Sequence, residues 1–253
     1  MLAILCLLSS VGCNLPSLVN QYKNLPYRPP KISCPEHINR GIGSIINHIL
    51  IRTIREGAFP DFSACQWVYG CNSSELFGTG GFRPAPPTSC SRAEILTAAA
   101  TALLDQHIPP TGRPHDVAVH IRNGDKLKSE SRDLAPMTRN ATWWLKFIKP
   151  IVHGSTFIAS DDCTIAHQVA SHFNSVEVRC EAPNGHFGRT VYTCSQAVQF
   201  LQDLWIMARA KVFVGSLKSN IPRLVAKLRG FDNNIVAVPG TGHMRTDWMW
   251  DND

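Results

Sequence analysis

Short apolar runs alternate with amphipathic stretches along the second half of the chain. The apolar runs have the length of buried strands and lie at 117–121, 155–159, 176–178, 211–215 and 235–238. The stretches between them carry apolar residues at helical spacing and lie at 141–152, 163–173, 196–208 and 220–229. Strands that alternate with helices predict a parallel sheet covered by helices on both faces, and therefore an α/β fold.

The first half of the chain has a less regular pattern. Residues 14–35 contain five prolines and little periodicity, which predicts an extended stem or linker. Apolar residues recur at helical spacing after Gly41, and Ser91 is placed to cap a further helix that runs to about His107. The Pro- and Gly-rich stretch 108–112 then interrupts the pattern. We expect four segments: a signal-like leader at 1–13, a stem at 14–39, a small α/β domain at 40–110 and a second domain at 111–253.

Charge and motif content exclude several classes of function. The formal net charge is +6, but the Lys and Arg residues are scattered singly, and no run of five basic residues occurs. A nucleic-acid surface would be more clustered, whereas a phosphate-bearing small ligand needs only one or two well-placed cations. The sequence contains no Cys-x-x-Cys pair, no Gly-x-Ser-x-Gly and no P-loop motif. We therefore expect no nucleic-acid partner and no zinc-ribbon site.

The N-terminus and the cysteines indicate the secretory pathway. The apolar run 2–8 has the length of a signal-peptide core and is too short to span a bilayer, and Ser10 and Gly12 are suited to cleavage. The cysteines beyond this leader fit disulfides plus one odd thiol or, as the alternative, buried thiols of a cytosolic protein. Sequons at Asn72 and Asn140 agree with the secretory route. We expect a protein of the Golgi lumen or the cell exterior, with membrane association through a short or missing N-terminal segment left open.

Polar residues follow three of the expected strands directly. Ligands bind at the carboxyl ends of parallel strands, so these residues are the first candidates for a site. Arg122, after the first strand, can hold a phosphate with two charge-assisted hydrogen bonds, although the same turn also fits a solvated loop. Asp161 and Asp162 follow the second strand. Ser219 and Asn220, after the fourth, precede a helix whose N-terminus is either plainly capped or an anion site.

Three motifs occur in the second half of the chain. They are His120-x-Arg122-x-x-Asp125-Lys126 with Glu130 four residues later, Phe157-Ile158-Ala159-Ser160-Asp161-Asp162, and Phe200-Leu201-Gln202-Asp203-Leu204 followed by Val212 to Arg223. In order and spacing, over about residues 117–229, they resemble the motifs of the α1,6-fucosyltransferase family. Gly41 to Ile54 is similar to the glycine-rich start of that family's N-terminal domain.

The resemblance implies a GT-B-like fold of two Rossmann-like domains. Residues 40–110 would form the acceptor side, and the parallel sheet of 111–253 would bind the nucleotide sugar. The reaction implied is an inverting, metal-independent transfer of fucose from GDP-fucose to a glycan hydroxyl, without a cofactor.

The resemblance also implies roles for individual residues. Arg122 would hold the diphosphate, Ser219 would contact the β-phosphate, His120 and Asp203 would contact the guanine or ribose, and Glu130 would be the general base. The donor-binding residues implied are His120, Arg122, Asp125, Lys126, Asp161, Asp162, Asp203, Ser216, Ser219 and Asn220.

The sequence is compatible with other functions. A sibling enzyme would transfer fucose to a protein or to a chitin-like oligosaccharide, and a nucleotide-sugar-binding relative would have no catalysis. The last has no need of a general base, so Glu130 favours an enzyme. Asn123 departs from the family, because many relatives carry a second basic residue there. The expected partners are a nucleotide sugar and a glycan or glycoprotein acceptor.

Overall fold

The computed structural model describes ten parts of the chain. They are residues 14–24, 42–43, 46–47, 49–51, 76, 90–109, 113–123, 140–180, 193–217 and 219–238. The helices are α1 (Leu15–Asn24), α4 (Arg92–Leu104), the 3-10 helix η2 (Asp105–His107), α7 (Ala141–Ile148), α8 (Cys163–Ala170), α9 (Cys194–Arg209) and α10 (Asn220–Leu228). The strands are β1 (Val117–Ile121), β2 (Thr156–Ser160), β3 (Val176–Arg179), β4 (Val212–Gly215) and β5 (Ile235–Ala237).

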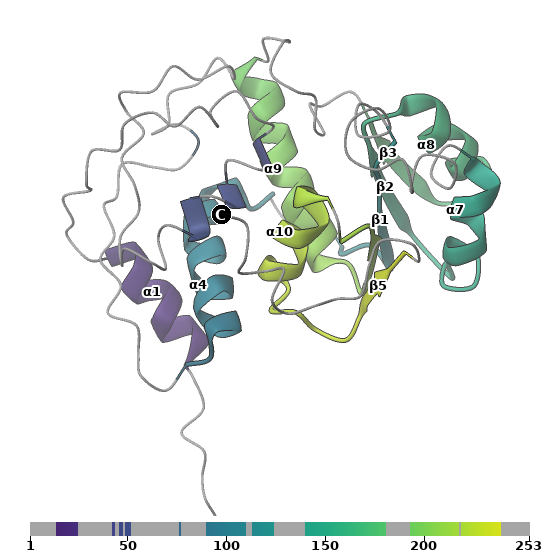
Figure 1. Ribbon diagram of the computed structural model, residues 1–253. Helices are drawn as coiled ribbons and strands as arrows, with labels where there is room; N and C mark the ends of the chain where they lie inside the picture. The colour runs from purple at the N-terminus through teal and green to yellow at the C-terminus, as the bar shows by residue number, and fades with distance from the viewer. Residues whose placement is uncertain are drawn as a thin grey trace, which may run out of the picture.

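The five strands form one parallel sheet with the order β3-β2-β1-β4-β5. Helices α7 and α8 cover one face of the sheet, and α9 and α10 cover the other (Figure 1). Helices α4 and α1 lie beyond α10 and α9, as a further layer on that side (Figure 1). The prediction of an α/β fold with a parallel sheet is therefore confirmed for the described residues.

Strand β1 shows why the central strands are continuous apolar runs in the sequence. All five of its residues are buried, because the sheet is covered on both faces. Val117, Val119 and Ile121 pack into the core on the α7–α8 side, whereas Ala118 packs into the core on the α9–α10 side. His120 alternates with Ala118, so the single polar side chain of this strand faces the α9–α10 layer.

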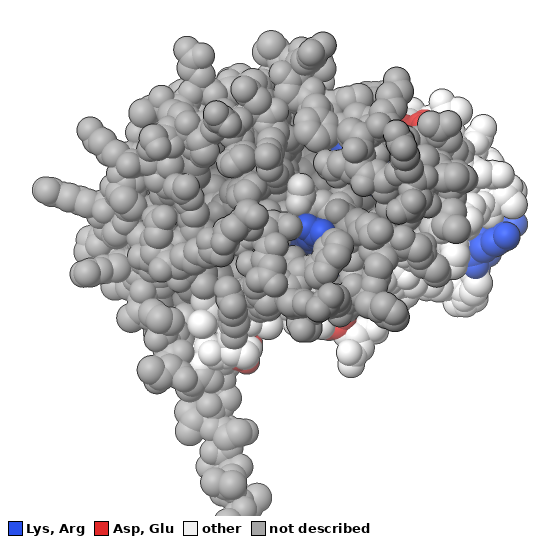
Figure 2. Space-filling view, viewed as in Figure 1, with Lys and Arg blue, Asp and Glu red and all other residues white. Residues whose placement is uncertain are grey.

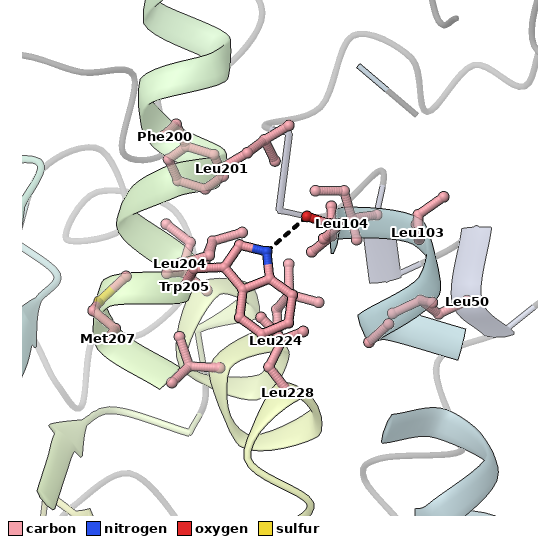
Figure 3. Packing of buried hydrophobic residues seen from close by; sticks show 14 of the residues in the cluster. Leu50, Leu103, Leu104, Phe200, Leu201, Leu204, Trp205, Met207, Leu224 and Leu228 are labelled. Atoms are coloured by element: carbon pink, nitrogen blue, oxygen red, sulfur yellow. Dashed lines mark hydrogen bonds between the residues drawn. The ribbon is translucent and has the colours of Figure 1, made fainter. Parts of the chain in front are cut away.

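Helix α9 joins the sheet to the outer helices through Trp205. This side chain is 7% exposed, and its indole N–H donates to the backbone oxygen of Leu104, at the end of α4, over 2.7 Å (Figure 3). Leu204 and Leu224 pack around the ring, from α9 and α10 (Figure 3). Fully burying side chains of this size stabilises the fold by about 1.5–3 kcal/mol each. One hydrophobic core therefore contains described residues from both sides of the boundary expected near residue 110, and that boundary stays a prediction.

The expectation of an extended segment from residue 14 is wrong for residues 15–24, which form α1. Pro16 lies in the first turn, where the missing N–H of proline would have no helical partner anyway. Leu18 is buried against the outer core, and Leu15 and Val19 pack beside it at helical spacing. Tertiary packing on α4 therefore decides the conformation of a short segment that shows little periodicity by itself.

Helix starts follow the local sequence closely. Ser91 caps α4 as predicted, and its backbone N–H donates to Glu94 while its hydroxyl accepts from the Glu94 N–H. Asp162 caps α8 as predicted, since its carboxylate accepts from the Ile165 N–H at 3.2 Å. The end of α7 is four residues earlier than expected, at Ile148 instead of residue 152.

A disulfide joins Cys163 at the start of α8 to Cys180 just after β3, and it encloses a sequence separation of 17 residues. Cys90 and Cys194 are also disulfide-bonded. Structural disulfides form in oxidising compartments, which agrees with a secreted or lumenal protein. Among the described residues, no helix is both long enough and apolar enough to cross a membrane.

Candidate functional site

The order of the sheet reverses between β1 and β4. Strands β2 and β3 extend from one side of β1, and the chain then crosses through α9 to place β4 on the other side. A reversal of this kind leaves a crevice at the carboxyl ends of the two central strands, where α/β proteins bind ligands. His120 pairs with Gly215 in the register of β1 and β4. The residues that follow, Arg122 on one strand and Ser216 on the other, therefore lie at the same edge.

Arg122 is held at this edge by residues that follow β2. Its side chain is 7% exposed, and Nη1 lies 2.5 Å from Oδ2 of Asp161. The other carboxylate oxygen of Asp161 accepts the backbone N–H of Asn123 at 2.7 Å. The Asn123 amide donates to Asp162 at 2.6 Å. Arg122 is thus buried and fixed between two strand ends rather than extended into solvent.

The start of α10 lies at the carboxyl end of β4. Ser219 is its N-cap residue and is buried, but its hydroxyl makes no capping hydrogen bond. The first N–H groups of a helix have no intrahelical partners, and together with the helix dipole they attract anions. A Cβ at Gly215 would come within 3.1 Å of Pro222 in this helix. Glycine at the end of β4 therefore permits the close approach of α10.

Two buried polar side chains lie on the sheet face that α9 covers. His120 is fully buried, and neither of its ring nitrogens has a hydrogen-bond partner among the described residues. Burial, and then the charge of Arg122, lowers the pKa of His120 to about 3, so its imidazole is neutral at neutral pH. Asp203 of α9 is also fully buried, and its Oδ2 has no hydrogen-bond partner in the described part of the chain. Unpartnered buried polar atoms are costly, which makes them candidates for ligand contacts.

Arg179, at the end of β3, forms an ion pair with this buried carboxylate. Its Nη1 lies 3.4 Å from Oδ1 of Asp203, while its Nε and Nη2 bind Glu177 at 2.9 and 2.6 Å. Burial raises the pKa of Asp203 to about 7, Arg179 opposes this rise, and Glu177 adds to it. The carboxylate is therefore poised to change its charge near neutral pH.

Asn47, a helical residue of the N-terminal half, contacts α10. The Asn47 amide donates to the backbone oxygens of Gly43 at 2.8 Å and Asn220 at 3.0 Å. Its oxygen accepts from Lys227, a buried residue of α10 whose pKa burial lowers to about 7. A Cβ at Gly43 would come within 3.2 Å of Ile221. Gly43 and Asn47 thus pack directly against the first turn of α10.

Several predicted site residues belong to this arrangement. Those at the strand ends, at the start of α10 or on the α9-covered face are His120, Arg122, Asp161, Asp162, Asp203, Ser216, Ser219 and Asn220. Asp125, Lys126 and Glu130 lie outside the described residues. Sequence reasoning missed Arg179, although it follows the third expected strand as directly as Arg122 follows the first.

A doubly wound parallel sheet with charged and polar side chains at its reversal point places this part of the chain among Rossmann-like α/β domains. No protein-family model and no curated protein sequence matches the chain. A solved structure of the α1,6-fucosyltransferase NodZ, soaked with GDP-fucose, is similar to it with 17% sequence identity and a TM-score of 0.30. The match covers 53% of this chain and 41% of the fucosyltransferase chain.

Proposed function

We propose that the chain is an inverting, metal-independent glycosyltransferase that moves fucose from GDP-fucose to a glycan hydroxyl. The observation that carries this proposal is the position of Arg122 and the start of α10 together at the reversal point of the sheet. The order of the three sequence motifs supports fucose as the donor sugar. The same resemblance supports a two-domain GT-B arrangement, with residues 40–110 on the acceptor side.

The phosphate end of the donor would lie between β1 and α10. Arg122 would donate to the diphosphate, and Ser219 with the first N–H groups of α10 would bind the β-phosphate. Negative charge accumulates on the diphosphate as the bond to fucose breaks. Donors fixed at that point stabilise the transition state more than the bound substrate.

The base end would lie on the α9-covered face of the sheet. Guanine presents N1–H and N2–H as neighbouring hydrogen-bond donors. A carboxylate such as that of Asp203 can accept a hydrogen bond from each. Neutral His120 can donate from one ring nitrogen and accept at the other. Uracil has a single N–H flanked by two carbonyl oxygens and would leave these buried groups poorly paired. This chemistry favours GDP over UDP.

The transfer itself needs a base on the acceptor side. The acceptor oxygen would attack the anomeric carbon of fucose, the bond to the diphosphate would break, and GDP would leave with the bonding electrons. Glu130 would take the proton of the acceptor hydroxyl. The expected oxidising environment and the leader support the Golgi lumen or the cell exterior as the location.

Calorimetry with GDP, UDP and CMP tests the binding half of this proposal. GDP should bind more tightly than UDP and CMP. Arg122→Met should weaken GDP binding about 10- to 150-fold, the equivalent of one charge-assisted hydrogen-bonding group. Ser219→Ala leaves the Arg122–Asp161 pair intact and should weaken GDP binding to a smaller extent. A preference for UDP would overturn the fucose assignment.

Lys146→Ala is the matched control, since it also removes one positive charge. Lys146 is exposed on α7. Figure 2 shows blue Lys or Arg side chains at the right-hand edge of the molecule, on the side where Figure 1 draws α7. This control should bind GDP like the wild type, because α7 lies on the sheet face opposite to α9 and α10. Circular dichroism of each variant checks that the loss of binding is not a loss of fold.

Hydrolysis of GDP-fucose, with and without EDTA, tests the catalytic half. Turnover should be insensitive to EDTA if no metal takes part. Glu130→Gln should keep GDP binding while lowering turnover by at least about 100-fold. GDP binding without any turnover in the wild type would favour the non-catalytic alternative.

A further inference from the structure

Asn140 is the N-cap residue of α7, a helix on the sheet face opposite to α9 and α10 (Figure 1). It begins the sequon Asn140-Ala141-Thr142, and both Asn140 and Thr142 are exposed. A sequon marks a glycan only where the asparagine amide is accessible in a chain that passes through the secretory pathway. The local geometry decides whether a glycan and the fold are compatible.

The oxygen and the nitrogen of the Asn140 amide have separate roles. Its Oδ1 accepts the backbone N–H of Thr142 at 2.8 Å and thereby caps α7. Its Nδ2 makes no hydrogen bond to the described residues. N-glycosylation replaces one hydrogen of Nδ2 and leaves Oδ1 unchanged. The cap and a glycan can therefore coexist on this side chain.

We propose that Asn140 is a site of N-glycosylation that keeps its role as the cap of α7. In the reaction, Nδ2 forms a bond to the anomeric carbon of a lipid-linked diphosphate oligosaccharide. The bond from that carbon to the diphosphate breaks, the lipid diphosphate leaves, and the amide loses a proton. This proposal is independent of the proposed transferase activity.

The surroundings of Asn140 support an outward glycan. In the first turn of α7, Thr142 is exposed, Ala141 and Trp143 are half-buried against the core, and Trp144 is buried. Trp143 packs edge-on against Trp144 and Phe147, at ring-centroid distances of 5.3 and 4.8 Å. The start of α7 thus leaves Asn140 and Thr142 open to solvent while its aromatic residues anchor the helix. The Cys163–Cys180 disulfide, which joins the start of the neighbouring α8 to the residue just after β3, indicates the oxidising compartment in which the modification takes place.

Site-resolved mass spectrometry tests this proposal on the full chain, expressed in a eukaryotic host with a secretory pathway. Peptide N-glycosidase in heavy-oxygen water converts an occupied Asn140 to a labelled Asp, which separates this position from the sequon at Asn72. We expect the label at residue 140 in the wild type and in Thr142→Ser, which keeps the sequon. We expect none in Thr142→Val, which keeps the cap but removes the hydroxyl.

A second pair of variants tests the dual role of the side chain. Asn140→Asp keeps an oxygen acceptor and removes the glycan, whereas Asn140→Ala removes both. The melting temperature of Asn140→Asp should exceed that of Asn140→Ala, because only Asp keeps an oxygen that can accept the Thr142 N–H. An unlabelled Asn140 in the wild type overturns the proposal, whether or not Asn72 is occupied. Equal melting temperatures for these two variants overturn the capping half.

Discussion

The buried carboxylate of Asp203 should make the protein less stable as the pH rises. Its pKa is raised from an ordinary value of 3.8 to about 7, first by burial. Between these two values the folded state binds a proton that the unfolded state has already lost. Stability from the protonated carboxyl is therefore fully present below about pH 4 and is lost as the pH rises through 7. Asp203→Asn keeps the shape of the side chain and removes this dependence.

The size of the effect follows from the shift in pKa. A difference of one pKa unit corresponds to about 1.4 kcal/mol, so the ionised carboxylate costs the folded state about 4 kcal/mol at about pH 8. At about pH 5 the same relation gives a cost of about 2 kcal/mol. The stability of Asp203→Asn relative to the wild type should thus increase by about 2–3 kcal/mol between these conditions.

Urea unfolding of both proteins across this pH range measures this change in relative stability. His120 also has different pKa values in the folded and unfolded states, because burial lowers its folded-state pKa to about 3. The stability that His120 contributes is therefore lost as the pH falls below 6.5. Both proteins contain His120, so its effect cancels in the comparison. Parallel stability profiles would refute the reasoning about Asp203. If the carboxylate also binds guanine, the stabilised variant should lose its preference for GDP.

The remaining predictions concern packing, the disulfide and the neighbour of the carboxylate. Trp205→Phe should destabilise the protein by about 2–4 kcal/mol in urea unfolding, because it leaves the carbonyl at the end of α4 without its indole donor and opens a small cavity. The double change of Cys163 and Cys180 to Ser should lower the free energy of unfolding in urea by about 3 kcal/mol, the loop-closure value for this separation. Arg179→Met should raise the pKa of Asp203, so the midpoint of any pH dependence of GDP binding should move to higher pH, and an unchanged midpoint would contradict the pairing.

The sheet could be predicted from the sequence because its strands are buried on both faces. A strand such as 117–121 has apolar residues on both sides, and its length separates it from the helices between the strands. The order of the strands in the sheet could not be predicted in this way, because all the strands show the same apolar pattern. Helix α1 was missed for the opposite reason. Its proline and its short length hide a helical face that is recognisable only once α4 is there to cover it.

The sequence predicted only those site residues that directly follow a strand. Arg122 and Ser219 follow strands directly, and the rule that ligands bind at carboxyl ends was sufficient to single them out. The partner of Arg122 was not predictable, because the pairing with Asp161 depends on the register of β1 and β2. From the sequence, Asn123 was interpreted as a position where a basic residue of the resembled family is missing. The structure gives it a separate role, since it binds both Asp161 and Asp162.

The charges around Arg122 bear on what attracts a diphosphate to this edge. Asp161 offsets the positive charge of the guanidinium, because the two groups are in contact and both are nearly buried. Asp162 adds a further negative charge beside Asn123. Arg122 is thus better suited to orient a bound phosphate than to attract one from solution. The first N–H groups of α10 lie at the same edge and have no intrahelical partners, so they should add to the affinity for a phosphate that Arg122 orients.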